Sequence, residues 1–216
     1  MTDSGTEPQK VMVEKQAKDL LSNHGISVPR SVLSKDLPAS IRLKFPVVLK
    51  VSDERILHKT DVGGVILNIG TQEALEREFI SMKSRFPDSE YLIEEMLPSG
   101  IEYIIGVTRD RDFGQVIMLG SGGIFTELYG DVTFRKIPIF KEDAEEMITG
   151  IASGRFCQGF RGKRVDCNAL ADLLIKISAL LESGSYPIES MDLNPVIALE
   201  KGVVVADAKI ILRGKS

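Results

Sequence analysis

Three polar residues near the end of the chain have the types and spacing of a metal site. Asp192 and Asn194 lie two positions apart in the extended segment 188–199, so both side chains point to the same side of a strand. Asp207 interrupts the apolar segment 203–212, and a turn between the two segments would make Asn194 and Asp207 cross-strand neighbours in a hairpin. Oxygen ligands in this arrangement suit Mg²⁺, which takes its other ligands from water and phosphates. The alternative is that these residues occupy a solvated strand face.

A lysine and a glycine-bearing loop in the first half of the chain suit phosphate binding. Lys50 breaks the apolar run 47–51, where a strand gives way to a loop, and could present an ammonium group to a phosphate. Gly63 and Gly64 end that loop, and a glycine pair lets backbone N–H groups approach an anion. His58, in the same loop, could act as a nucleophile or base. The alternatives are a strand-end lysine and a loop histidine that both reach solvent.

A second glycine cluster follows another apolar strand. Gly120, Ser121, Gly122 and Gly123 come directly after the run 116–119, with Arg135 further downstream. Such a cluster suits either a phosphate or a tight turn. A phosphate lysine, glycine loops and a pair of oxygen ligands have Mg-nucleotide binding in common.

Strands and helices must position these residues. The two kinds of element alternate in the first half of the chain, whereas each kind is grouped in the second half. Apolar spacing predicts helices over residues 14–23, 71–85, 142–152 and 169–183. Thr71 is expected to cap the second of these helices, and Leu170, Leu174 and Ile177 belong to an apolar stripe on the last. Strands are expected over residues 45–51 and 65–69, then as an antiparallel meander over 91–96, 102–108 and 115–119, and last as the hairpin 188–212. This order predicts an α+β fold of two lobes with a cleft between them.

Composition excludes several classes of function. The chain has 216 residues with 27 Lys and Arg against 31 Asp and Glu, so its net charge is −4, which disfavours nucleic acid as a partner. No apolar run approaches the roughly 20 residues of a membrane span. The N-terminus does not look like a signal peptide. Cys157 and Cys167 match no zinc pattern, so we expect reduced cysteines and a cytoplasmic location.

Five segments resemble, in order, the motifs of one family. They are the run from Lys50 through His-Lys-Thr-Asp-Val-Gly-Gly-Val, then Leu-Ile-Glu-Glu-Met-Leu, Ile-Ile-Gly-Val-Thr-Arg-Asp, Met-Leu-Gly-Ser-Gly-Gly-Ile-Phe-Thr-Glu-Leu and Met-Asp-Leu-Asn-Pro. The family is the ATP-grasp β subunits of ADP-forming acyl-CoA synthetases, typified by ADP-forming acetate–CoA ligase. The resemblance implies one ATP-grasp domain over residues 1–216, with an N-terminal lobe at 8–96, a C-terminal lobe at 97–216 and a nucleotide between them.

The resemblance also implies a role for individual residues in the nucleotide and phosphoryl-transfer site. The implied roles are phosphate binding for Lys50, Gly63, Gly64 and Arg135; a hinge that reads adenine for Glu94, Glu95, Met96 and Leu97; ribose binding for Glu102; Mg²⁺ binding for Asn194 and Asp207; phosphoryl shuttling for His58; and places beside the phosphohistidine for Ser121, Gly122, Gly123 and Asp192. Relatives of the succinate type carry a glutamate where Asp192 stands.

The implied reaction is acyl-CoA + ADP + phosphate ⇌ acid + CoA + ATP. The resemblance implies an acid–thiol ligase that is active only with an α subunit, in an αβ or α2β2 complex. The β subunit would bind Mg²⁺ with ATP or ADP and move a phosphoryl group between a phosphohistidine and ADP. The alternatives are a non-catalytic module that senses a nucleotide or an acyl-CoA, and a carboxylate–amine ligase, which would need an acceptor site in this chain.

Overall fold

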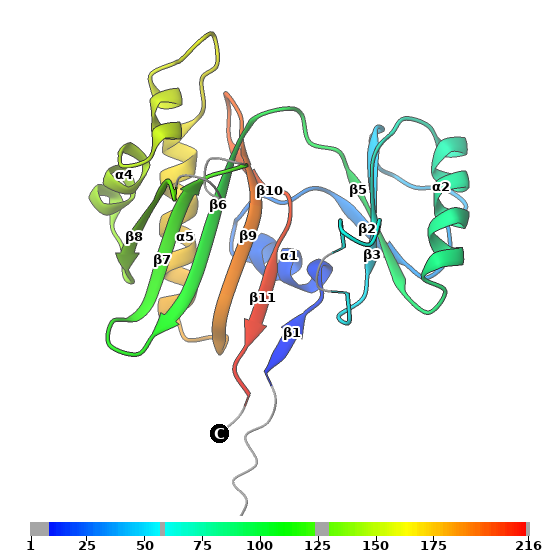
Figure 1. Ribbon diagram of the computed structural model, residues 1–216, viewed down its shortest axis with the longest axis horizontal. Helices are drawn as coiled ribbons and strands as arrows, with labels where there is room; N and C mark the ends of the chain where they lie inside the picture. The colour runs from blue at the N-terminus through cyan, green and yellow to red at the C-terminus, as the bar shows by residue number, and fades with distance from the viewer. Residues whose placement is uncertain (1–8, 57–58, 124–129, 215–216) are drawn as a thin grey trace, which may run out of the picture. The chain divides into compact units, whose positions relative to one another are not determined.

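The computed structural model describes residues 9–56, 59–123 and 130–214 (Figure 1). The chain divides into two compact units. The small unit contains Val13–Gln16 and Pro29–Leu97, and the large unit contains Met1–Met12, Ala17–Val28 and Pro98–Ser216. The small unit ends at Leu97, and residues 17–28 cluster with the large unit, while the expected lobes at 8–96 and 97–216 stay a prediction.

The large unit is a seven-stranded sheet with the strand order β1-β11-β9-β6-β7-β8, and β10 pairs with β9. Its strands are β1 (Lys10–Met12), β6 (Ile101–Asp110), β7 (Gly114–Ser121), β8 (Val132–Lys136), β9 (Ile188–Ala198), β10 (Val203–Val205) and β11 (Lys209–Leu212). Its helices are α4 (Lys141–Thr149), the 3₁₀ helix η1 (Ala152–Cys157) and α5 (Cys167–Glu182).

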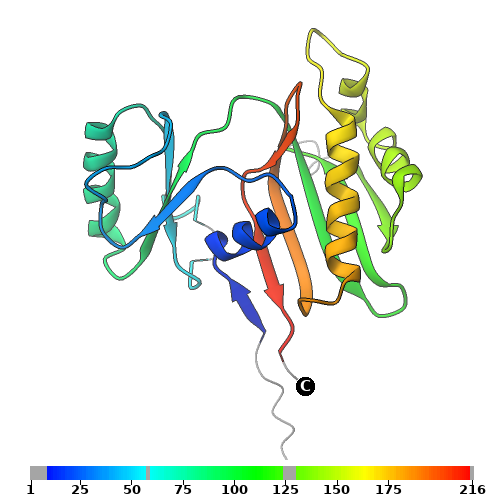
Figure 2. The same ribbon diagram turned by 180° about the vertical axis from the view of Figure 1, so that it is seen from behind.

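One face of this sheet is covered by helices. Figure 2 shows α5 lying along the sheet with α4 beside it. The apolar stripe of α5 that the sequence predicted, which includes Leu170, Leu174 and Ile177, is buried in the core. Side chains of strand β9 alternate between the two faces, with Met191 and Leu193 buried in the core and Asp192 and Asn194 on the opposite face. The other face is therefore free to carry polar groups.

The small unit is a four-stranded sheet with the order β2-β5-β3-β4. Its strands are β2 (Ser31–Ser34), β3 (Val47–Ser52), β4 (Val65–Ile69) and β5 (Glu90–Glu95), and its helix is α2 (Gln72–Arg85). Helix α2 flanks this sheet (Figure 1) and buries Leu75, Phe79 and Met82. Thr71 caps α2 as predicted, because its side chain accepts a hydrogen bond from the backbone N–H of Ala74.

Helix α1 (Glu14–Asn23) has its first turn in the small unit and its later residues in the large one. It matches the expected helix 14–23. The expected three-strand meander is wrong, because β5 pairs with β2 and β3 of the small sheet whereas β6 and β7 pair with each other in the large sheet.

The prediction of reduced cysteines is also wrong. Cys157 and Cys167 form a disulfide with their Cα atoms 5.5 Å apart. The backbone between them doubles back through a bridge of Phe160 with Lys163, which brings the two ends of the segment together. The cysteines therefore give no argument for a reducing compartment. Within the residues that the structure describes, no helix is both long and apolar enough to cross a bilayer.

Candidate functional site

Lys50 is buried in the small unit within a cluster of charges. Its ammonium lies 2.5 Å from Glu14 Oε1 and 3.0 Å from Glu94 Oε2, and its side chain is only 8% exposed. Strand register explains the contact with Glu94, because Lys50 pairs with Leu92 on β5, and Glu94 lies two residues further along on the same face. The alternative of a strand-end lysine that reaches solvent is therefore excluded.

Glu14, on the first turn of α1, was not singled out by sequence reasoning. Its Oε2 lies 2.5 Å from Lys59 Nζ, while its Oε1 accepts from Lys50, so one buried carboxylate bridges two lysines. It is 36 residues from Lys50 along the chain. No local pattern could have revealed that pairing.

The loop after β3 is closed by its glycine pair. The N–H of Gly64 donates to the carbonyl of Lys59 at 2.7 Å, and the carbonyl of Gly64 accepts from Val51 N–H at 2.8 Å. A Cβ on Gly64 would lie 2.5 Å from a methyl group of Val51, so the close approach of loop and strand requires glycine there. Gly63 has φ +67°, which also favours glycine. His58 lies outside the residues that the structure describes.

The small unit ends at the segment expected to be a hinge. Glu94 is buried, whereas Glu95 accepts from the backbone N–H of Lys44 at 2.9 Å and pairs with Arg30 at 3.3 Å. The N–H of Met96 donates to Pro46 O, so the chain stays attached to the sheet up to the last residues of the unit.

In the large unit, the expected hairpin places Asn194 and Asp207 opposite one another. Val205 pairs with Val196, and Lys209 pairs with Asp192, so the register between these pairs sets Asp207 against Asn194. Asp192 and Asn194 share one face of β9, as their spacing predicted, and this face is directed away from the core.

Burial and the nearby charge of Asp207 raise the pKa of Asp192, and Lys209 partly opposes them. Carboxylates whose charges repel in this way fit a cation. Among the described residues, no group of three His, Cys, Asp or Glu side chains could hold a metal. The oxygen donors here are therefore the amide of Asn194 and one or two carboxylates, a set that suits Mg²⁺ with water and phosphate as the other ligands.

Glu102 and the second glycine cluster line a common hollow of about 530 Å³ in the large unit. The N–H of Gly122 donates to the carbonyl of Glu102 at 2.8 Å, and a Cβ on Gly122 would lie 2.5 Å from that carbonyl carbon. Gly123 has φ +68°. The hydroxyl of Ser121 is buried and hydrogen-bonds Asp131 and Ser153, so this side chain holds the fold together. Sequence reasoning missed the other polar residues of this hollow, which include Arg155 and Lys163.

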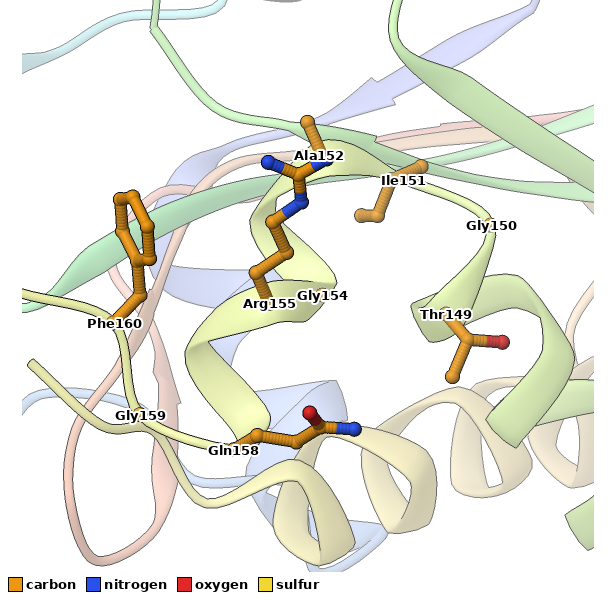
Figure 3. Close-up of a pocket in the computed structure, with 9 residues that line it drawn as sticks. All are labelled: Thr149, Gly150, Ile151, Ala152, Gly154, Arg155, Gln158, Gly159 and Phe160. Carbon is orange, nitrogen blue, oxygen red and sulfur yellow. The ribbon is translucent and has the colours of Figure 1, made fainter.

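A neighbouring hollow of about 550 Å³ is drawn in Figure 3. It lies between the end of α4 and η1, and the side chain of Gln158 extends beneath it while that of Arg155 projects toward Ala152 (Figure 3). None of the residues predicted to act in the site lines it.

Arg135 does not join the other predicted residues. It pairs with Ile117 on β7, so it lies on the helix-covered face, where its guanidinium binds Glu146 of α4 at 2.8 Å. Asp192 lies on the opposite face of the sheet, because it pairs with Gly106, which in turn pairs with Met118 next to Ile117. We therefore leave Arg135 out of the site.

One unit carries a buried lysine among carboxylates, and the other carries opposed side chains with oxygen atoms, an arrangement that is compatible with nucleotide binding. The ATP-grasp domain family matches residues 4–212, so the chain belongs to the ATP-grasp family. The β subunit of ADP-forming acetate–CoA ligase II from Pyrococcus furiosus is 42% identical over 94% of this chain and 92% of that protein. Within its family, the chain thus belongs with the β subunits of ADP-forming acetate–CoA ligases.

Two further relatives extend the comparison. The ADP-forming acetate–CoA ligase II of Archaeoglobus fulgidus is 39% identical over 94% of this chain, but this chain spans only 30% of that longer protein. A structure of acetyl-coenzyme A synthetase 1 from Ca. Korarchaeum cryptofilum matches with a TM-score of 0.85 and 40% identity over 94% of this chain and 93% of that one. That structure holds coenzyme A and Mg-AMPPCP, with its phosphohistidine segment pointing towards the nucleotide binding site.

Proposed function

We propose that this chain is the nucleotide-binding β subunit of an ADP-forming acyl-CoA synthetase. It binds ATP or ADP and transfers a phosphoryl group between a phosphohistidine and ADP in the reaction acyl-CoA + ADP + phosphate ⇌ acid + CoA + ATP. The observation that carries this proposal is the 42% identity to a β subunit of such a ligase over nearly the whole of both chains.

In the proposed site, Lys50 binds the nucleotide phosphates, and Gly63 and Gly64 let the adjoining loop approach them. Segment 94–97 contacts the adenine, and Glu102 contacts the ribose. Buried ammonium groups and loop amides stabilise charge on a transferring phosphoryl group more strongly than exposed ones, since water is excluded around them. His58 is the proposed phosphoryl carrier, and Asp192 and the backbone of 121–123 are proposed to assist the transfer.

Asn194 and Asp207 would hold Mg²⁺ in this site. The register that sets them opposite each other and the charge repulsion at Asp192 support this assignment. The bound ion would neutralise charge on the nucleotide phosphates.

An α subunit is the proposed partner, in an αβ or α2β2 complex. Supporting this, the matched Pyrococcus protein is named as a β subunit, and the longer Archaeoglobus relative extends well beyond the matched region. The α subunit would supply the CoA-binding and acid-activating parts. A cytoplasmic location stays a prediction.

The test is reconstitution. The chain is purified with the protein that co-purifies with it from its source cell, and ADP phosphorylation is measured with acetyl-CoA and phosphate. We expect ATP formation that needs both proteins and is abolished by His58→Asn. A complex that binds ADP but never forms ATP, with any of several acyl-CoA substrates, would instead support the sensing module.

A further inference from the structure

The bridging of Lys50 and Lys59 by one carboxylate is unusual for a purely structural ion pair. Glu14 has a side chain only 2% exposed, and each of its oxygens lies 2.5 Å from a different ammonium. Taking charges out of water is unfavourable unless they are paired and hydrogen-bonded, so the two lysines are close together because an anion lies between them. Lys59 also belongs to the loop that Gly64 closes onto β3.

A buried hydroxyl lies on the same strand as Lys50. Ser52 follows Lys50 by two positions on β3, so both side chains lie on the same face of the strand. Ser52 is 6% exposed, and its Oγ has no hydrogen-bond partner among the residues that the structure describes. A buried hydroxyl without a partner is unfavourable, and a ligand oxygen that accepted its hydrogen bond would remove that penalty.

The donors in this region match a tetrahedral oxyanion. Two ammonium groups and one hydroxyl can each donate to a different oxygen of a phosphate, and charge-assisted donors of this kind are the strong ones. The carboxylate of Glu14 provides two oxygens at the position where such a phosphate would receive both ammonium groups.

We propose that Ser52 and Lys59 complete, with Lys50, a site for a phosphate group of the nucleotide. Glu14 is the internal counter-anion of this site, and the phosphate replaces it on binding. This inference rests on the proposed nucleotide-binding function, but it assigns groups that the function does not require. It makes Ser52 and Lys59 binding residues and Glu14 a residue that sets phosphate affinity.

Each of three variants should change ADP affinity and melting temperature in a different way. Glu14→Gln removes a charge that competes with the phosphate, so ADP affinity should rise by about tenfold, the effect of one nearby charge at intermediate dielectric. Lys59→Met should weaken ADP binding by at least about tenfold. Ser52→Ala removes an unpartnered hydroxyl, so the free protein should melt at the same or a higher temperature while its ADP affinity falls by about fivefold.

The experiment is calorimetric titration of ADP into the full chain and these variants, with melting temperatures measured with and without ADP. Glu54→Gln is the matched control, because it removes an exposed carboxylate from the same loop and should leave ADP affinity within twofold. Failure of the unmodified chain to bind ADP, alone or with its α subunit, would refute the proposed function itself.

If the unmodified chain binds ADP, the inference stands or falls on the variants. Weaker or unchanged binding in Glu14→Gln would show that Glu14 does not compete with phosphate. A Ser52→Ala protein that loses stability and keeps its ADP affinity would show a structural serine. Either result overturns the inference while leaving nucleotide binding intact. Should Glu14→Gln not fold, Ser52→Ala and Lys59→Met decide the outcome.

Discussion

Replacing Lys50 should destabilise the small unit as well as weaken nucleotide binding. The Lys50→Met side chain keeps a similar length, but Glu14 and Glu94 then face each other's charge without the ammonium that lies 2.5 and 3.0 Å from them. Removing one partner from a buried ion pair typically destabilises a protein by about 3–5 kcal/mol. For a chain of this size, a loss of about 3 kcal/mol corresponds to a melting temperature roughly 6–12 °C lower.

A double-mutant cycle isolates the ion pair from the loss of packing. Glu94→Gln alone removes one of the two carboxylates that balance the buried charge of Lys50, and we expect it to lower the free energy of unfolding by about 2–3 kcal/mol. The double variant Lys50→Met/Glu94→Gln removes one charge of each sign, so its loss should fall short of the sum of the single losses by about 2 kcal/mol. Thermal and urea unfolding followed by circular dichroism measure these differences.

The control is Lys44→Met, which makes the same substitution at an exposed lysine of the same unit and should change stability by less than about 0.5 kcal/mol. Single losses that simply add, or a Lys50→Met protein as stable as the control, would refute the reasoning. Either outcome would mean that water or rearranged side chains compensate the charges, and that the cluster is not the tightly coupled group its distances indicate.

Further predictions concern the large unit. Asp166 accepts at 3.0 Å from the N–H of Gly202, which with other backbone donors lowers its pKa from the ordinary 3.8. Asp166→Ala should therefore reduce the free energy of unfolding by about 1–2 kcal/mol at pH 7. The difference in stability between the variant and the unmodified chain should shrink as the pH falls below 3.8, because the carboxylate of the unmodified chain then protonates as well. A difference that does not depend on pH would contradict this. Gly122→Ala should displace the backbone of Glu102 and lower nucleotide affinity. A variant that keeps both its nucleotide affinity and its stability would show that the contact between residue 122 and Glu102 relaxes without cost. Cys157→Ser should lower the unfolding free energy by about 2–3 kcal/mol, and a reducing agent should do the same to the unmodified chain but not to this variant.

The sequence predicts features that depend on neighbours close in the chain. Helix α2 and its Thr71 cap, the buried stripe of α5 and the hairpin of β9 with β10 and β11 follow from spacing alone. The opposition of Asn194 and Asp207 belongs to this group, because a hairpin turn fixes the register of the strands it joins.

Features that depend on distant pairing escape such reasoning. Strand β5 directly precedes β6 in the chain, which favours a meander, yet it pairs with β3 from much earlier in the chain. The same non-local pairing sets Glu94 beside Lys50, and α1 brings Glu14 to both. The charge cluster could therefore be anticipated only as single polar residues.

Arg135 shows how the two kinds of information combine. A cation downstream of a glycine cluster favours a phosphate contact when only composition is considered. Side chains alternate between the faces of a sheet, so the register decides which face receives that cation. Because Arg135 pairs with Ile117 of the core, whereas Asp192 pairs with Gly106, a shift of one residue in β8 would have sent the guanidinium to the face that carries Asp192. A basic residue near a glycine loop is thus evidence for a phosphate site only once it is known which face of the sheet its side chain occupies.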